Sequence, residues 1–106
     1  MRAKDGAELR ELSREAWWAA FVADQIHRRL TGEEVVITAG TDGRHRVERS
    51  SHYRGDGLDF RRWILEDQAQ RFADELRTAL GPDYVVILES DHVHCHWSPV
   101  YHGEPS

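Results

Sequence analysis

The C-terminal stretch YVVILESDHVHCHW, residues 84–97, restricts the fold more than any other part of this chain. It opens with a run of apolar and β-branched residues, 84–88, which is typical of a buried strand. A turn is indicated near Ser90 and Asp91, and the following HVHCHW alternates with the two-residue period of a strand. The two runs predict an antiparallel β-hairpin, so the rest of the chain has to supply a layer that buries one face of it.

An amphipathic helix is predicted from residue 7 to residue 30. Apolar residues recur there at three- and four-residue steps, which places them on one face of a helix. Gly32 follows the last periodic residue and is expected to end the helix. We expect Trp17, Phe21 and Val22 to widen the buried face, because a tryptophan-rich stripe of this kind usually belongs to a core.

The remaining elements are a second helix and two short strands. The helix is predicted over about 65–80, where apolar residues share one face and Gly81 follows. Residues 35–38 are mostly β-branched and predict a buried strand, and residues 58–60 rejoin the sheet after a long polar loop, 41–57. This order of elements predicts an α+β domain in which two main helices pack on a small, largely antiparallel sheet.

A chain of 106 residues forms one domain, 1–106, with a loose tail from about residue 101. The formal net charge of −5 disfavours a nucleic-acid binder. No apolar run has the length of a signal peptide core or a membrane span, so we expect a protein made in the cytoplasm that does not insert into membranes. We also expect a monomer. Arginines gathered around the polar loop nevertheless predict a local anion-binding surface: Arg44, Arg46, Arg49, Arg54, Arg61 and Arg62.

The only cysteine, Cys95, excludes an internal disulfide and any zinc motif built from several cysteines. Metal chemistry must therefore use histidines and carboxylates. On a strand, His92, His94 and His96 project to one side, while Val93 and Cys95 point to the other, where Cys95 is expected to be a buried, inert thiol. Imidazole is the commonest neutral ligand of zinc, so three of them on one face indicate a metal site. The pattern alone leaves open which two face the metal.

A second polar cluster lies in SSHYRGDGLDF, residues 50–60. Catalytic zinc usually takes three protein ligands and keeps a fourth position for water, so two histidines on a strand are an incomplete site. His52 and Asp59 could complete it, but Gly55 and Gly57 argue against a helix that would stack them on one face. We expect a glycine-bent loop to bring the two side chains to a common point.

These two clusters resemble the zinc D,D- and L,D-peptidase family of cell-wall peptidases, which has a hedgehog-type fold. Residues 50–59 match its pattern Ser-x-His-x-x-Gly-x-Ala-x-Asp, with Gly57 in place of the small Ala. Residues 91–94, Asp-His-Val-His, fit its catalytic acid three positions before a ligand histidine. The resemblance covers about residues 35–98 and is strongest to small phage and prophage members, which include endolysins.

The resemblance implies a Zn²⁺ ion held by His52, Asp59 and His94. It also implies that Asp91 acts as the general base toward the zinc-bound water, and that His92 helps to stabilise the negative oxygen of the tetrahedral intermediate. Strict alternation would place Asp91 opposite His94. The assignment therefore requires Asp91 to lie in the turn before the strand.

Other residues near these motifs receive weaker roles. Arg44 and His45 are predicted substrate contacts, and Ser50 either joins them or braces the loop through its hydroxyl. Glu89 is a fallback base, and His96 competes with the other two histidines for the metal. Each of these residues also has an ordinary reading as loop polarity or surface charge.

The predicted function is hydrolysis of peptide bonds in peptidoglycan by a zinc-activated water, after release at lysis or in a virion. An alternative is a catalytically silent relative that binds a wall peptide or a virion partner through the same pocket. A metal-dependent oxygenase of the double-stranded β-helix type also displays His-x-His, but it needs many more strands and a later ligand, and only His102 follows. The family includes endopeptidases and carboxypeptidases of several specificities, so the bond that is cut stays open.

Overall fold

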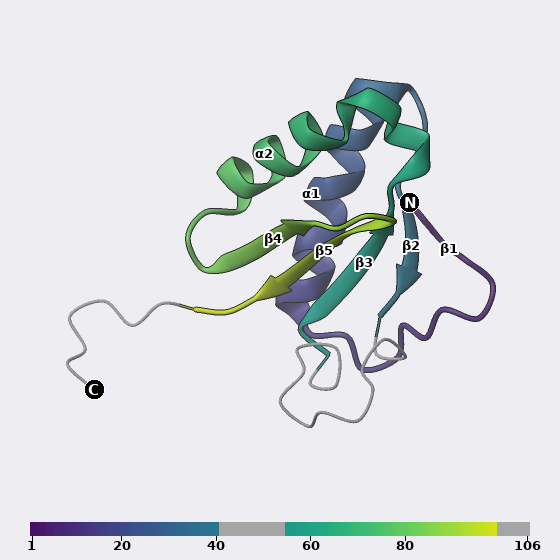
Figure 1. Cartoon of the computed structure of the whole chain (residues 1–106). Helices are drawn as coiled ribbons and strands as arrows, with labels where there is room; N and C mark the ends of the chain where they lie inside the picture. Colours follow the sequence, from purple (N-terminus) through teal and green to yellow (C-terminus); the bar gives the residue numbers. More distant parts are fainter. Residues whose placement is uncertain (41–54, 100–106) are drawn as a thin grey trace.

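Within residues 1–40 and 55–99, which the computed structural model describes, five short strands form one sheet and two α-helices pack on it (Figure 1). The arrangement confirms the predicted α+β class, with two main helices on a largely antiparallel sheet. The elements in chain order are β1 (Arg2–Ala3), α1 (Arg14–Thr31), β2 (Val36–Ala39), β3 (Gly57–Arg61), the 3-10 helix η2 (Trp63–Gln68), α2 (Ala69–Leu80), β4 (Tyr84–Leu88) and β5 (His92–Trp97).

The sheet has the strand order β1-β2-β3-β5-β4, and all neighbours pair antiparallel except β1 with β2. The predicted hairpin is confirmed as β4 and β5, with Ile87 opposite His94. Strand β1 was not predicted, because Arg2 and Ala3 are too few residues to show a period and pair with β2 at long range. No helix in the described parts of the chain has both the length and the apolar composition to cross a membrane.

Helix α1 begins at Arg14, later than the predicted residue 7. Ser13 caps it, since its hydroxyl accepts a hydrogen bond of 3.0 Å from the Ala16 amide. Leu9 and Leu12 continue the helical period, but they pack on the core from a non-helical segment before the cap. The predicted end is confirmed: Gly32 has φ 81, and its amide donates to the Arg28 carbonyl.

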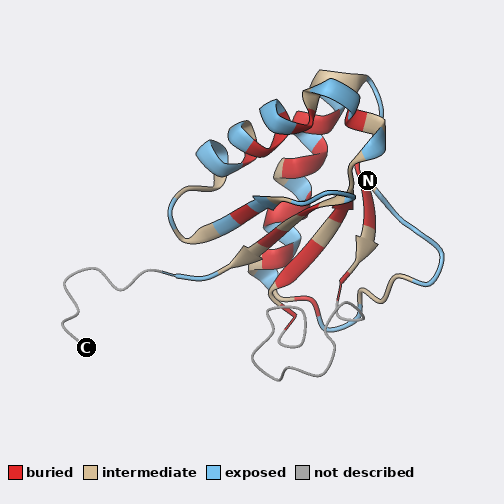
Figure 2. Ribbon diagram, viewed as in Figure 1, coloured by how far each residue is buried: buried red, intermediate tan, exposed pale blue. Residues whose placement is uncertain are grey.

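The prediction that the aromatic stripe of α1 is buried is wrong. Trp17, Trp18 and Phe21 are 40%, 54% and 49% exposed, and Val22 is only partly buried. Figure 2 shows the buried side of α1 turned toward the sheet. Small residues form that side, which lets the helix backbone approach its neighbours closely: Ala16, Ala19, Ala20 and Ala23.

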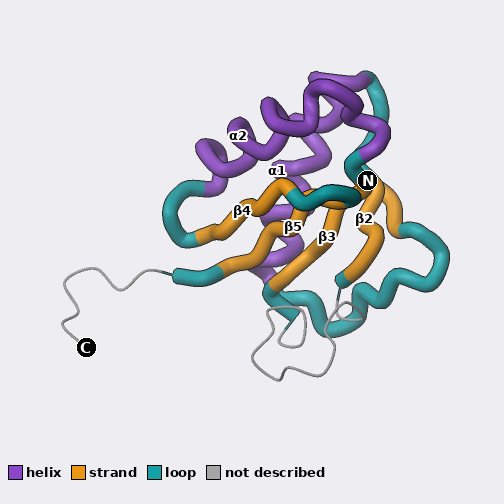
Figure 3. Tube along the Cα trace, in the orientation of Figure 1, coloured by secondary structure: helices purple, strands orange, loops and turns teal. Residues whose placement is uncertain are grey.

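The second predicted helix, 65–80, is two helical segments in the structure. Figure 3 shows η2 and α2 as consecutive coils. The chain kinks within η2 at Glu66, whose φ of 52 is left-handed, and α2 begins after η2 at Ala69. The end at Leu80 is confirmed, because Gly81 has φ 85 and its amide donates to the Arg77 carbonyl. The shared face of α2 is buried as predicted, with Phe72 and Leu76 in the core.

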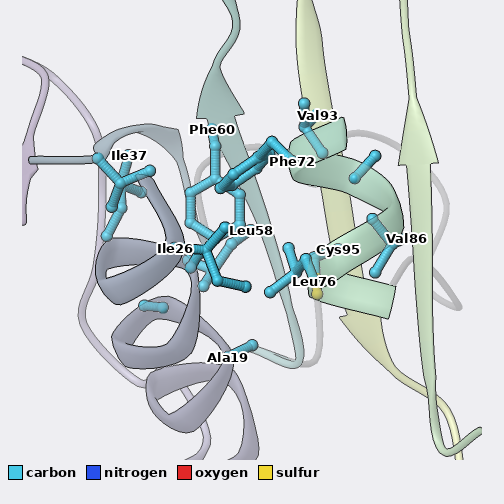
Figure 4. Packing of buried hydrophobic residues seen from close by; sticks show 14 of the residues in the cluster. Ala19, Ile26, Ile37, Leu58, Phe60, Phe72, Leu76, Val86, Val93 and Cys95 are labelled. Atoms are coloured by element: carbon cyan, nitrogen blue, oxygen red, sulfur yellow. The ribbon is translucent and has the colours of Figure 1, made fainter. Parts of the chain in front are cut away.

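One face of the sheet forms the core with both helices (Figure 4). Leu58 and Phe60 of β3 and Val93 and Cys95 of β5 point into this layer and are almost fully buried. Phe60 meets Phe72 of α2 edge-on, with 6.3 Å between ring centroids. Because side chains alternate along a strand, the residues between these four lie on the opposite face, which we call the polar face. The core thus fixes where β3 and β5 present their polar side chains.

Candidate metal and catalytic site

Asp59 and His94, two of the predicted zinc ligands, are brought together on the polar face. They are direct partners in the β3–β5 register, although 35 positions separate them in the sequence. The Nδ1 atom of His94 lies 2.9 Å from Oδ1 of Asp59. Both side chains are largely covered, with exposed fractions of 14% and 18%. The structure thus brings these two predicted ligands into contact, and their binding of zinc stays a prediction.

The three alternating histidines share the polar face, as predicted. Nε2 of His94 lies 2.8 Å from Nδ1 of His96, and Nε2 of His92 lies 3.6 Å from Oδ1 of Asp59. His92, His94 and His96 of β5 and Asp59 of β3 therefore form a continuous polar row across the two strands. The opposite face of β5 is apolar and carries Cys95. Burial raises the pKa of the Cys95 thiol to about 12, which keeps the thiol protonated and unreactive near neutral pH.

Asp91 precedes the first residue of β5 and lies in a bend, which confirms the placement that its predicted role requires. Its Oδ1 atom is 2.6 Å from Nδ1 of His92. The carboxylate is 85% exposed, so solvent or a ligand can reach it. His92 thus links Asp91 at the mouth of the site to Asp59 within it.

The separations on the polar face suit two ligands of one zinc ion. With metal–ligand bonds of about 2.0–2.1 Å, two ligand atoms of a tetrahedral site stand about 3.3 Å apart. The distances from Asp59 Oδ1 to His94 Nδ1 and to His92 Nε2, 2.9 and 3.6 Å, lie on either side of that value. Carboxylate and imidazole are also the donor types that zinc takes. Among the residues the structure describes, however, no group of three or more His, Cys, Asp or Glu is arranged to hold a metal ion.

Several predicted residues lie outside the described residues: the ligand His52, the substrate contacts Arg44, His45 and Ser50, and Arg46, Arg49 and Arg54 of the predicted anion-binding surface. Their roles stay predictions.

The bend before Asp59 is described, and it corrects the expectation for the two glycines. Gly55 has φ 80, which favours glycine, whereas Gly57 is the first residue of β3 and has no positive φ. The Gly55 carbonyl accepts a hydrogen bond of 2.8 Å from the amide of Ser13, the cap of α1. The start of β3, and through it Asp59, is therefore fixed to the start of α1.

A pocket of about 340 Å³ opens beside the polar row. Asp59, Asp91 and His92 are among the residues that line it. Lys4 and Arg61 line it as well, and Thr38 and Trp63 complete the wall.

Sequence reasoning missed Lys4 and Trp63 as members of this pocket. Lys4 reaches it only because β1 pairs with β2, a contact that no local pattern shows. Trp63 could have been noticed as a large aromatic side chain two residues after Arg61, which was already part of the predicted anion-binding surface.

Comparison with protein-family models, curated proteins and solved structures found no match to this chain. The motifs that carry the resemblance to zinc cell-wall peptidases are residues 50–59 and 91–94, and the zinc ion and the family stay predictions.

Proposed function

We propose that this protein is a zinc-dependent peptidase that hydrolyses peptide bonds in bacterial peptidoglycan. The observation that carries the proposal is the contact between Asp59 and His94, two residues far apart in sequence that the motif pair had singled out as ligands. Asp91, singled out as the base, lies at the mouth of the same site. We further propose that the protein is made in the cytoplasm and acts on the wall after lysis or as part of a virion.

His52, Asp59 and His94 would hold the ion, with His52 supplied from outside the described residues. Bound zinc would lower the pKa of a water toward neutrality and polarise the substrate carbonyl. The exposed Asp91 carboxylate takes the proton of the attacking water and returns it to the leaving amine. The contact between Asp91 Oδ1 and His92 Nδ1 orients the imidazole ring, so that its Nε2 atom points toward Asp59.

The direct test is to load the protein with zinc, incubate it with purified peptidoglycan of several chemotypes, and identify the fragments by mass spectrometry. We expect new amino groups and a single type of cleaved bond. Asp91→Ala should lower turnover by roughly 10²- to 10⁴-fold and leave bound zinc unchanged, since general acid–base catalysis contributes on that order. Asp67→Asn is the matched control, because Asp67 is an exposed carboxylate outside the pocket. Absence of any cleavage across the chemotypes would refute the proposal.

A catalytically silent binding protein is the second candidate. The observation that favours it is that Asp59, His94 and His96 already contact one another in a chain of 2.9 and 2.8 Å. Such a chain can hold a polar surface in place without a metal. The Asp91→Ala variant separates the two candidates. If the protein only binds wall fragments, the variant should bind them as tightly as the wild type does, and the wild type itself should show no turnover.

A further inference from the structure

We propose that Lys4, Arg61 and Trp63 form a carboxylate-binding subsite next to the polar row. The inference rests on the proposed function and names a requirement of its substrate: a free carboxylate close to the bond that is cut. The subsite lies in the 340 Å³ pocket beside His92, which is the strand partner of Arg61 in the β3–β5 register.

Arg61 differs from most arginines in the described parts of the chain because it forms no ion pair with a described carboxylate. Arg28 and Arg71, for example, each contact an acidic side chain four positions away on the same helix. Neither Arg61 nor Lys4 forms an ion pair with any residue that the structure describes. Two cations that line a pocket without anionic partners leave their hydrogen-bond donors available to a ligand.

Trp63 holds the Arg61 guanidinium in a defined position. The guanidinium carbon lies 5.2 Å from the centre of the indole ring, within the range of a cation–π contact. The ring itself is 69% exposed, an unusual state for tryptophan, and it forms part of the pocket wall. A guanidinium stacked in this way keeps its planar fork of N–H donors, which matches the two oxygens of a carboxylate.

The position of Arg61 sets the distance to the reacting bond. Arg61 and Asp59 point to the same face two positions apart on β3, which corresponds to about 6.6 Å along the strand. A carboxylate on Arg61 therefore lies one to two residues along a peptide from a carbonyl held near Asp59. The carboxylates of Asp59 and Asp91 line the same pocket and disfavour more highly charged anions such as phosphate.

Two groups in a wall peptide can supply this carboxylate. One is the C-terminal carboxylate of the stem peptide, which would make the enzyme a carboxypeptidase. The other is the α-carboxylate left free when glutamate is linked through its side chain, which would make it an endopeptidase near that residue. Both present a single carboxylate beside a peptide bond, so they need separate arms in the experiment.

Binding is measured on the protein as purified, by following the indole N–H resonance of Trp63, assigned with Trp63→Phe. The probes are diacetyl-L-Lys-D-Ala-D-Ala and L-Ala-γ-D-Glu-L-Lys, each compared with the form in which the carboxylate in question is an amide. For one of the two probes, we expect the amide form to bind about tenfold more weakly than the acid form. A loss of this size corresponds to one charge-assisted hydrogen bond. Arg61→Gln should abolish this preference, Arg61→Lys should reduce it, and Arg14→Gln, an exposed arginine outside the pocket, should leave it intact.

Equal binding of acid and amide in both pairs, or a preference that survives Arg61→Gln, would overturn the inference. The outcome is separable from the proposed function because binding needs no turnover. Cleavage of peptidoglycan without a carboxylate preference would remove the subsite and leave the peptidase. An Arg61-dependent preference without cleavage would support the subsite in a silent binding protein.

Discussion

The two faces of strands β3 and β5 are built from alternate residues of the same short segments, but one face forms the core and the other carries the polar side chains. On the face toward the helices, Leu58, Phe60 and Val93 have no measurable exposure. On the polar face, Asp59 and His94 contact each other through polar atoms. Burial of apolar area stabilises the first face, whereas the second gains little net free energy from hydrogen bonds that replace bonds to water. The fold should therefore depend on one face and the chemistry on the other.

The largest expected effect is the loss of a core ring. Phe60→Ala removes a fully buried side chain that packs against Phe72, and it should lower the free energy of unfolding by about 3–5 kcal/mol. Equilibrium unfolding in urea measures this change. Ile87→Ala is the matched control on the polar face, since Ile87 is 40% exposed and its truncation should lower stability by less than about 1.5 kcal/mol. Similar losses for the two variants would contradict the division between the faces.

The second effect concerns the buried thiol of Cys95, whose pKa is raised by burial from 9.0 to about 12. As the pH rises above 9, the unfolded chain loses this proton before the folded chain does, which stabilises the unfolded state. The stability is thus complete below pH 9 and falls by about 1.4 kcal/mol for each pH unit toward pH 12.

Urea unfolding at pH 8, 9, 10 and 11 tests this, with Cys95→Ala as the comparison. The variant should lack the part of the slope that comes from Cys95. Tyr84 should contribute to the slope in both proteins, since burial is the main cause that raises its pKa to about 12, with a smaller part from Cys95 itself. A thiol reagent should label the native protein only after denaturant is added. Rapid labelling of the folded protein at pH 8 would show that the Cys95 thiol is accessible to solvent and not buried in the core.

The alternation of the two faces could be predicted from HVHCHW because a two-residue period has only one outcome on a sheet with one buried side. The pairing of Asp59 with His94 could be proposed only by joining two motifs, since 35 positions separate them. Lys4 could not be placed, because its position depends on the long-range pairing of β1 with β2. Local periods predict which way a side chain points, and strand pairing decides what it meets.

Helix α1 shows where hydrophobicity alone misleads. The period continues through Leu9 and Leu12, and only the Ser13 cap reveals that the helix begins later. Trp17 and Phe21 looked like core residues by size, but the alanine side of the helix is the one that packs. Close packing favours small residues where a helix approaches its neighbours, and the sequence does not show how closely α1 approaches the sheet.

The third effect tests how the core side positions the polar face. Gly55 has φ 80, and a Cβ atom there would lie 2.2 Å from the Glu11 carbonyl oxygen, so Gly55→Ala forces the backbone to move. We expect a loss of about 1–3 kcal/mol in urea unfolding. Gly6→Ala is the control, because Gly6 has φ 92 but open space around its Cβ position, and it should lose about 1 kcal/mol from backbone strain alone. The Gly55 variant should also shift the NMR signals of Asp59 and His94, and unchanged signals would show that the bend does not set their position.

The smallest effect on stability is expected where the effect on chemistry is largest. Val93 and His94 are neighbours in β5 that point to opposite faces. Val93→Ala opens a cavity and should lower stability by about 2 kcal/mol while bound zinc, measured by elemental analysis, is retained. His94→Ala should lower it by less than about 1 kcal/mol, because it removes polar contacts that water can replace, and the protein should no longer hold zinc. If His94→Ala kept its zinc and lost as much stability as Val93→Ala, the polar row would support the sheet and the metal would have to bind elsewhere.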